Sequence, residues 1–116
     1  MPFADLSTLT AEERFFAGFI LNKLWTYRYW CGGVKRQHLG HTAKENLPKG
    51  RSRSDSGKIY SVAKKLKKAG FINIFKATGK DHVCASRNEA IINNGLIVVN
   101  DFRLSVGLPV LEKTEI

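Results

Sequence analysis

The stretch GRSRSDSGKIYSVAKKLKKAGF combines an apolar stripe at helical spacing with a clear stop signal, and it constrains the fold more than any other part of the chain. The stripe consists of residues three or four apart: Ile59, Val62, Ala63, Leu66 and Ala69. Ser54 or Asp55 can cap the N-terminus. Gly70 suits the left-handed position after the last turn, where Phe71 can pack back on Leu66. The pattern predicts a helix over about residues 55–69 that buries the stripe and exposes its lysines.

The same stretch contains Gly57-Lys58, which raises the alternative of a phosphate-binding loop of an NTPase. A Walker A loop has four residues between its glycines and a Ser or Thr after the lysine, because that hydroxyl holds magnesium. Here six residues separate Gly50 from Gly57, and Ile59 follows Lys58. The preceding segment, HTAKENLPK, is not an apolar strand. The sequence therefore favours a helix without nucleotide chemistry.

Two short runs rich in β-branched and aromatic residues follow this helix, FINIFKA at 71–77 and HVCAS at 82–86. The residues between them, TGKD, include Gly79, which supplies a tight turn. These features predict a β-hairpin.

The N-terminal part of the chain begins a helix with a capping box, Thr10-x-x-Glu13. We expect this helix to run over about residues 11–30 and to end at Gly32-Gly33. Its main apolar stripe is formed by Phe16, Ile20, Leu24, Tyr27 and Cys31. Phe15 and Phe19 point away from that stripe, so they either contact the C-terminal segment or form a dimer contact.

Two further capping signatures predict short helices. Thr42-x-x-Glu45 opens one that stops at Pro48, because proline cannot continue a helix. Ser86-x-x-Glu89 opens another that ends at Asn94-Gly95. The remaining runs, LIVVN and FRLSVGLPV, are typical of late strands or an extended tail.

Charge is distributed unevenly along the chain. The net charge of the 116 residues is +9, but the segment from Lys35 to Asp81 holds thirteen Lys or Arg and three acids, a net of +10. The rest of the chain sums to −1. A basic middle between near-neutral ends is typical of a face that binds a polyanion, although lysine-rich helices are often only solvated surfaces.

Length and composition indicate one domain with a modest core. No apolar stretch approaches the length of a membrane span, and the start, MPFADLSTLTAEE, lacks the pattern of a signal peptide, so we expect a cytoplasmic protein. In that compartment Cys31 and Cys84 are expected to be reduced core residues rather than a disulfide.

Metal binding and catalysis have little support in the sequence. His38-x-x-His41, His82-x-Cys84 and Cys31 include the ligand types that zinc takes, but the ordered four-ligand spacing of a zinc site is missing. The ten acids are scattered, and no Ser/His/Asp or Cys/His grouping marks an active site. We expect no metal, no cofactor and no enzyme activity.

Over about residues 10–86, the order of long helix, short helix, loop, basic helix and hairpin resembles the winged helix-turn-helix superfamily. HTAKENLPKG followed by a lysine-rich helix ending KKAGFI is similar to small archaeal winged-helix proteins of unassigned role. The resemblance implies an α+β fold of three helices and a two-stranded wing over residues 1–86. In that fold the third helix enters the major groove and the wing touches the backbone or minor groove. The C-terminal extension, residues 87–116, is not covered, and we expect it to pack on the same domain.

The candidate nucleic-acid contacts lie in the loop before the basic helix, on the helix and at the hairpin. They are Lys49, Arg51, Arg53, Ser56, Gly57, Lys58, Tyr60, Ser61, Lys64, Lys65, Lys68, Lys76 and Lys80. Gly57 would let the backbone approach a groove, and Ser61 and Lys64 offer donors to base edges or phosphates. Tyr60 is either such a contact or a half-buried packing residue.

The leading functional hypothesis is sequence-specific binding of double-stranded DNA, as a transcription regulator or DNA-associated accessory protein. RNA or ribosome binding by the same basic face is one alternative, although Phe71 and Phe75 lie in a short hairpin and not on an open sheet of exposed aromatics. The other is a winged-helix module that binds an acidic protein. Ser56 and Ser61 favour DNA, because an acidic partner needs no polar residues that read bases.

Overall fold

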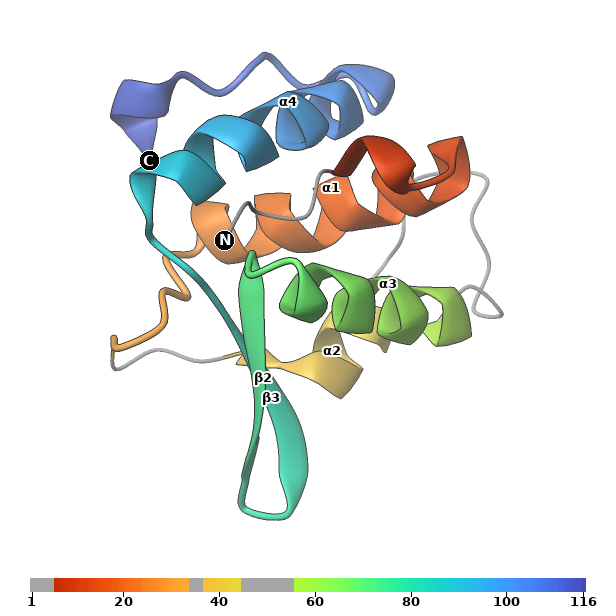
Figure 1. Ribbon diagram of the computed structural model, residues 1–116, viewed down its shortest axis with the longest axis vertical. Helices are drawn as coiled ribbons and strands as arrows, with labels where there is room; N and C mark the ends of the chain where they lie inside the picture. Colours follow the sequence, from red (N-terminus) through yellow and green to blue (C-terminus); the bar gives the residue numbers. More distant parts are fainter. Residues whose placement is uncertain (1–5, 34–36, 45–55) are drawn as a thin grey trace.

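The computed structural model describes residues 6–33, 37–44 and 56–116. It shows an α+β fold with four α-helices and a three-stranded antiparallel sheet in the described part of the chain. The elements are η1 (Leu6–Thr8), α1 (Ala11–Thr26), β1 (Gln37–His38), α2 (Leu39–Lys44), α3 (Ser56–Lys68), β2 (Ile72–Ala77), β3 (Lys80–Ala85), α4 (Glu89–Ser105) and η3 (Lys113–Glu115). Figure 1 shows α1 between α4 on one side and α3 on the other, with the β2–β3 hairpin projecting away from α4.

The predicted capping box of α1 is confirmed. The backbone N–H of Glu13 donates to Thr10 Oγ1 (3.1 Å), and the N–H of Thr10 donates to Glu13 Oε1 (3.0 Å). The predicted end of the helix near residue 30 was wrong, because Arg28 takes a left-handed conformation (φ 63°) and the N–H of Tyr29 donates back to the carbonyl of Leu24. Consequently Tyr27 is 52% exposed and is not part of the buried stripe.

The capping prediction at Thr42 was also wrong. Thr42 lies inside α2 and is fully buried, and its hydroxyl donates to the carbonyl of His38 (3.5 Å). The cap is His38, whose Nδ1 accepts the backbone N–H of His41 (3.2 Å). Imidazole is an uncommon helix cap, so a search for Ser, Thr, Asp and Asn misses it. Residues 45–55, which include Pro48 and the proposed caps of the next helix, lie outside the described residues.

Helix α3 matches its prediction closely. Its apolar stripe is buried, and Gly70 follows it with φ 88°. The N–H of Phe71 donates to the carbonyl of Leu66 (3.0 Å), and that of Gly70 donates to the carbonyl of Lys67 (3.0 Å). These are the two hydrogen bonds of a Schellman motif. They satisfy carbonyls at the end of the helix and turn the chain into β2.

The predicted hairpin is also confirmed. Strands β2 and β3 pair antiparallel from Ile72↔Ala85 to Ala77↔Lys80, and β1 adds to the other edge of β3, which gives the order β1-β3-β2. Thr78 and Gly79 form the turn with φ values of 54° and 78°. Positive φ at both positions is the mark of a type I′ turn, whose twist matches that of the flanking strands.

The two cysteines form a disulfide, so the prediction of reduced thiols was wrong. Cys31 and Cys84 are joined with a Cα–Cα distance of 4.9 Å. The backbone brings them together: the N–H of Cys31 donates to the carbonyl of Ala85 and the N–H of Ala85 donates to the carbonyl of Tyr29, both at 2.8 Å. Fifty-three residues separate the cysteines in sequence, and their proximity is a product of tertiary structure.

Helix α4 takes the place of the predicted short helix and of the run LIVVN, which was expected in a late strand or an extended tail. Of the run FRLSVGLPV, the first four residues belong to α4, and residues 106–110 follow it without a helix or strand. Helix α4 begins after Asn88, whose Oδ1 accepts the N–H of Ala90 (2.9 Å), so Ser86 is not the cap. It runs without a break through Asn94-Gly95. A Cβ on Gly95 would lie 3.0 Å from two ring atoms of Trp25, which indicates that this glycine provides room for the indole and does not end the helix.

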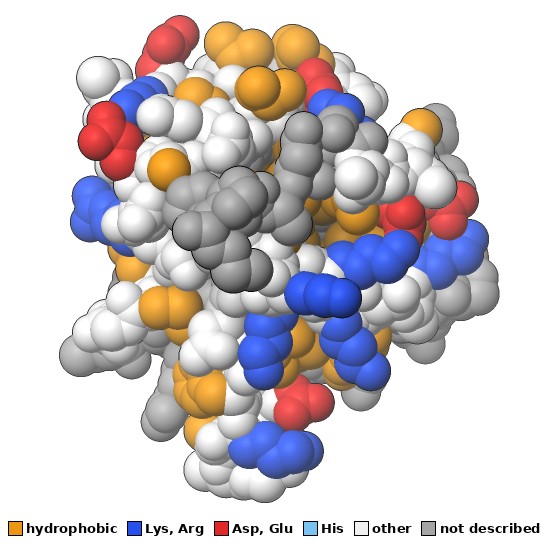
Figure 2. Space-filling view, viewed as in Figure 1, with side chains coloured by type: hydrophobic (Ala, Val, Ile, Leu, Met, Phe, Trp, Pro, Cys, Tyr) orange, Lys and Arg blue, Asp and Glu red, His pale blue; other side chains and the backbone are white. Residues whose placement is uncertain are grey.

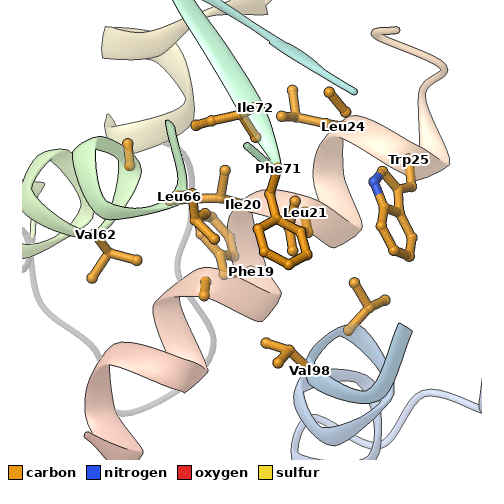
Figure 3. Packing of buried hydrophobic residues seen from close by; sticks show 14 of the residues in the cluster. Phe19, Ile20, Leu21, Leu24, Trp25, Val62, Leu66, Phe71, Ile72 and Val98 are labelled. Atoms are coloured by element: carbon orange, nitrogen blue, oxygen red, sulfur yellow. The ribbon is translucent and has the colours of Figure 1, made fainter. Parts of the chain in front are cut away.

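The core lies on both sides of α1 (Figure 3). On one side α1 packs against α3 and the start of β2, where Ile20, Leu66 and Phe71 are fully buried. On the other side it packs against α4, and a Cβ on Gly18 would lie only 2.7 Å from the carbonyl oxygen of Val98. Within the described part of the chain, no helix is long and apolar enough to cross a membrane.

Phe15 and Phe19 contact the C-terminal helix, as one of the two interpretations from the sequence expects. Their ring centroids lie 5.2 Å and 5.8 Å from that of Phe102 in α4. Phe19 is only 8% exposed, so its ring has its partners inside the chain. A dimer through these residues therefore loses the observation that suggested it.

Candidate nucleic-acid interface

The outward face of α3 is formed by four exposed residues of the thirteen candidates: Gly57, Ser61, Lys64 and Lys68. Their spacing of four, three and four residues places them in one row along the helix. The helix contains five lysines and no acidic residue. Figure 2 shows Lys and Arg side chains gathered on the side of the molecule formed by α3 and the hairpin. This row is therefore a basic surface that also carries a hydroxyl and an open backbone position.

Two of the candidate lysines are held away from this row by α1. Lys58 Nζ lies 2.8 Å from Glu12 Oε1, and Lys65 donates a hydrogen bond to Glu13. The hydrogen bond from Lys65 and a second one from the Thr10 backbone lower the pKa of Glu13. These pairs fix α3 against the first turn of α1, and they give Lys58 and Lys65 partners within the chain.

The opposite flank of α3 faces the hairpin and α2. Lys67 Nζ donates to the carbonyl of Ile74 in β2 (3.3 Å). Tyr60 is partly buried against the core, and its hydroxyl lies 3.3 Å from where a Cβ on Gly40 would stand. The packing interpretation of Tyr60 thus has direct structural support, while its hydroxyl lies at the edge of the exposed row.

The hairpin places two more candidates beyond the end of α3. Lys80 is the first residue of β3, directly after the turn, and it is exposed. Lys76 lies across from Asp81, with 3.4 Å between Nζ and Oδ1, and its side chain is 75% exposed. Such an exposed pair contributes little stability and leaves the lysine able to exchange partners.

Four candidates cannot be placed. Lys49, Arg51 and Arg53 lie outside the described residues, as does the side chain of Ser56 at the start of α3. The loop predicted to contact phosphates before the helix therefore remains a prediction from sequence.

All three histidines of the chain meet where β1, β3 and α2 come together. The ring centroid of His38 lies 4.6 Å from that of His41 and 5.4 Å from that of His82. Phe75 of β2 stacks on His82 at 5.9 Å, so the three strands carry a row of rings. Sequence spacing alone puts His41 near His38, whereas the approach of His82 depends on the pairing of β1 with β3.

The histidine cluster consists of His38, His41 and His82. Among the described residues, no group of three or more His, Cys, Asp or Glu side chains has the geometry to hold a metal ion. Cys84, a candidate ligand in the sequence, is used in the disulfide. The Nδ1 atom of His38 is used as the cap of α2.

Comparisons of the chain with family models, curated proteins and solved structures found no match. The class of protein is therefore defined by its own structure: an α+β domain with one basic helix-and-hairpin face. The function has to be argued from that face.

Proposed function

We propose that this chain is a winged helix-turn-helix protein that binds double-stranded DNA. The helices α1, α2 and α3 followed by the β2–β3 hairpin have the order of that fold, and β1 completes the small sheet beside β3. In this arrangement α3 is the recognition helix and the hairpin is the wing. The helix α4 packs on the side of α1 away from α3, so it leaves the basic face open (Figure 1).

The observation that carries the proposal is the exposed row on α3. It presents two lysines, a serine and a glycine without any acid on the same helix. A helix of this kind fits the major groove of B-DNA, where lysine and serine can donate to base edges. Apart from its chain neighbours and its own helix backbone, no atom of the described residues lies within 4 Å of the Cβ position of Gly57, so the backbone there is open to close approach.

Duplex DNA fits this face better than the two alternative partners. The major groove of A-form RNA is too deep and narrow for side chains to read, so a protruding helix has no place in it. An acidic protein would need only positive charge, whereas the row also offers Ser61 and an open backbone at Gly57. We assign no enzymatic role and no cofactor to the chain, and we propose that it acts as a transcription regulator or DNA-associated accessory protein.

Binding measured by fluorescence anisotropy tests the proposal. Duplex DNA, structured RNA and an acidic protein would each be titrated at two or more salt concentrations. If the face neutralises about five phosphates, the log–log plot of duplex affinity against salt has a slope of about −4 to −5. Tighter binding of RNA or of the acidic protein, or a duplex slope near zero, would contradict the proposal.

Single substitutions distinguish residues that contact base edges from residues that contact only the DNA backbone. Lys80→Ala should weaken all duplexes alike and reduce the salt slope by about one, because a wing lysine contacts phosphate only. Ser61→Ala or Lys64→Ala should instead reduce the difference in binding free energy between a preferred site and random DNA by about 1–3 kcal/mol. Lys113→Ala is a matched control, because Lys113 pairs with Glu89 (3.0 Å) in the C-terminal part of the chain. If all these variants lose the same affinity on every DNA sequence, α3 is a phosphate-binding surface, and the proposal of sequence-specific binding is wrong.

A homodimer remains part of the proposal, but through exposed apolar side chains other than Phe15 and Phe19. Four of the five large apolar side chains that are exposed in the described residues come from α4 and the segment after it: Ile97, Leu104, Leu108 and Val110. Size-exclusion chromatography with light scattering would give about twice the 13.0 kDa chain mass for a dimer. A mass of one chain at high micromolar concentration would rule the dimer out.

A further inference from the structure

A cleft of about 460 Å³ lies between the C-terminal halves of α1 and α4. Because α1 separates α4 from α3 (Figure 1), the cleft is not part of the proposed DNA-binding face. Small-molecule sites in proteins typically have volumes of about 300–1,000 Å³ and mostly apolar walls with a few polar groups. The cleft is therefore large enough for a small organic ligand.

The walls of the cleft are mostly apolar. Phe19 of α1 and Phe102 of α4 line it and pack against each other, with 5.8 Å between their ring centroids. Tyr27 and Leu108 also line it, and they are 52% and 40% exposed. A ligand that covers these two side chains removes apolar surface from water, which favours a ligand with an apolar body.

The wall formed by the segment after α4 is held in place by hydrogen bonds. Gly107 turns the chain with φ 82°, and the N–H of Leu108 donates to the carbonyl of Arg103 (2.8 Å). The side chain of Asn100 pairs with the backbone of Leu111: its Oδ1 accepts the N–H (2.7 Å), and its Nδ2 donates to the carbonyl (3.2 Å). A wall that is already ordered lowers the entropy cost of binding a ligand.

Arg103 gives the cleft a positively charged group. It lines the cleft, and its side chain joins the two walls: Nε donates to the carbonyl of Pro109 (2.7 Å) and Nη1 donates to Asn22 Oδ1 (2.8 Å). Both acceptors are uncharged. A guanidinium has five N–H donors, so the donors on Nη2 remain for a carboxylate, with which an arginine forms strong charge-assisted hydrogen bonds. Among the described residues that line the cleft, Lys23 is a second cation and none is an acid.

We propose that this cleft binds a small amphipathic carboxylate: the guanidinium of Arg103 binds the carboxylate group, and the apolar walls hold a ring or a short hydrocarbon chain. The inference goes beyond the proposed DNA binding and does not depend on it, because the cleft and the basic face share no residue. Charge and shape together select the ligand, since an apolar molecule leaves the guanidinium without a carboxylate and a small inorganic anion leaves the walls uncovered.

Isothermal titration calorimetry with phenylacetate tests the proposal. Phenylacetamide is nearly the same shape but neutral, and acetate has the charge but no ring. We expect phenylacetate to bind one site per chain about tenfold more tightly than phenylacetamide, because hydrogen bonds to a charged group are stronger than neutral ones. Acetate should bind at least about tenfold more weakly than phenylacetate, because it buries no ring. The backbone amide NMR signals of Val106 and Leu108 should shift during the phenylacetate titration.

Two leucines offer a matched pair of variants. Leu104 and Leu108 are both exposed, but Leu108 lines the cleft and Leu104 does not. Leu108→Glu should weaken the binding of phenylacetate about fivefold, as expected for two like charges at about 4 Å in water. Leu104→Glu should bind it as the unchanged protein does. Arg103→Gln should abolish the preference for phenylacetate over phenylacetamide. If it weakens both probes equally, Arg103 only holds the segment after α4 and does not bind the carboxylate.

Other results would overturn the inference altogether. These are no binding of phenylacetate at millimolar concentrations, equal binding of phenylacetamide, or NMR shifts confined to α3 and the hairpin, which would place the anion on the basic face. If light scattering gives the mass of two chains and no probe binds, a second copy of the chain covers the cleft in place of a ligand. Duplex binding is measured separately from these titrations, so failure of the cleft and failure of the proposed DNA binding are distinguishable.

Discussion

Gly18 is the glycine at which an added methyl group should lower the stability of the fold most. It lies in the middle of α1, where α4 crosses it. A Cβ built on Gly18 would stand 2.4 Å from Phe102 Cβ and 2.7 Å from the carbonyl oxygen of Val98. Neither atom is the end of a flexible side chain, so the clash can be relieved only by moving one helix away from the other.

The cost of Gly18→Ala is the difference between two opposing effects. In an unobstructed helix, alanine is favoured over glycine by about 1 kcal/mol. Overpacking of a core costs about 1–3 kcal/mol or more. Separation of the helices would also loosen the rings of Phe15 and Phe19, which pack on Phe102. We expect a net loss of about 2 kcal/mol, which corresponds to a decrease in Tm of roughly 5–10 °C for a chain of this size.

Urea unfolding and thermal unfolding followed by circular dichroism would measure this loss. Gly57→Ala is the matched control, because it is the same substitution in a helix at a position where the new Cβ meets no other described element within 4 Å. That variant should be as stable as the unchanged protein or slightly more stable. If Gly18→Ala also unfolds at or above the concentration of urea needed for the unchanged protein, α1 and α4 do not pack as closely as described.

Three further predictions concern the disulfide, the hairpin turn and the first turn of α1. In the variant Cys31→Ser/Cys84→Ser the free energy of unfolding, measured with urea, should fall by up to about 4 kcal/mol, because the bond closes a loop across a sequence separation of 53. An unchanged free energy of unfolding would contradict this. Thr78→Asn should raise the free energy of unfolding by about 0.5–1 kcal/mol in the same assay, because a β-branched residue is disfavoured at φ 54° and Asn is not. The Thr78 hydroxyl donates to the carbonyl of the preceding residue. A decrease in stability would show that this hydrogen bond contributes more than the backbone preference. The pKa of Glu13 is lowered from 4.5, mainly by the hydrogen bond from Lys65, so its contribution to stability is present above pH 4.5 and is lost as the pH falls through the folded-state pKa. Glu13→Gln should therefore be less stable than the unchanged protein at pH 7 and equally stable in strong acid, and a difference that persists in strong acid would refute the role of the charge.

The sequence by itself determined the elements whose causes are local. The capping box at Thr10, the stripe and Schellman ending of α3, and the type I′ turn at Gly79 each depend on residues within a few positions of one another. Such short-range hydrogen bonds and backbone preferences are encoded directly in neighbouring side chains. The exposed row of the candidate interface could be predicted for the same reason, because one helical period places Ser61, Lys64 and Lys68 together.

Contacts between residues far apart in sequence decided the rest. Gly95 looked like a helix end, yet the indole of Trp25 occupies the space beside it and the helix continues. Lys58 and Lys65 matched the other lysines by spacing, and only the position of α1 pairs them with acids. The disulfide and the histidine cluster likewise depend on β3 lying beside segments from the first half of the chain. A single sequence carries no periodic signal for such pairings, because they are produced by the packing of whole elements and not by the spacing of neighbours.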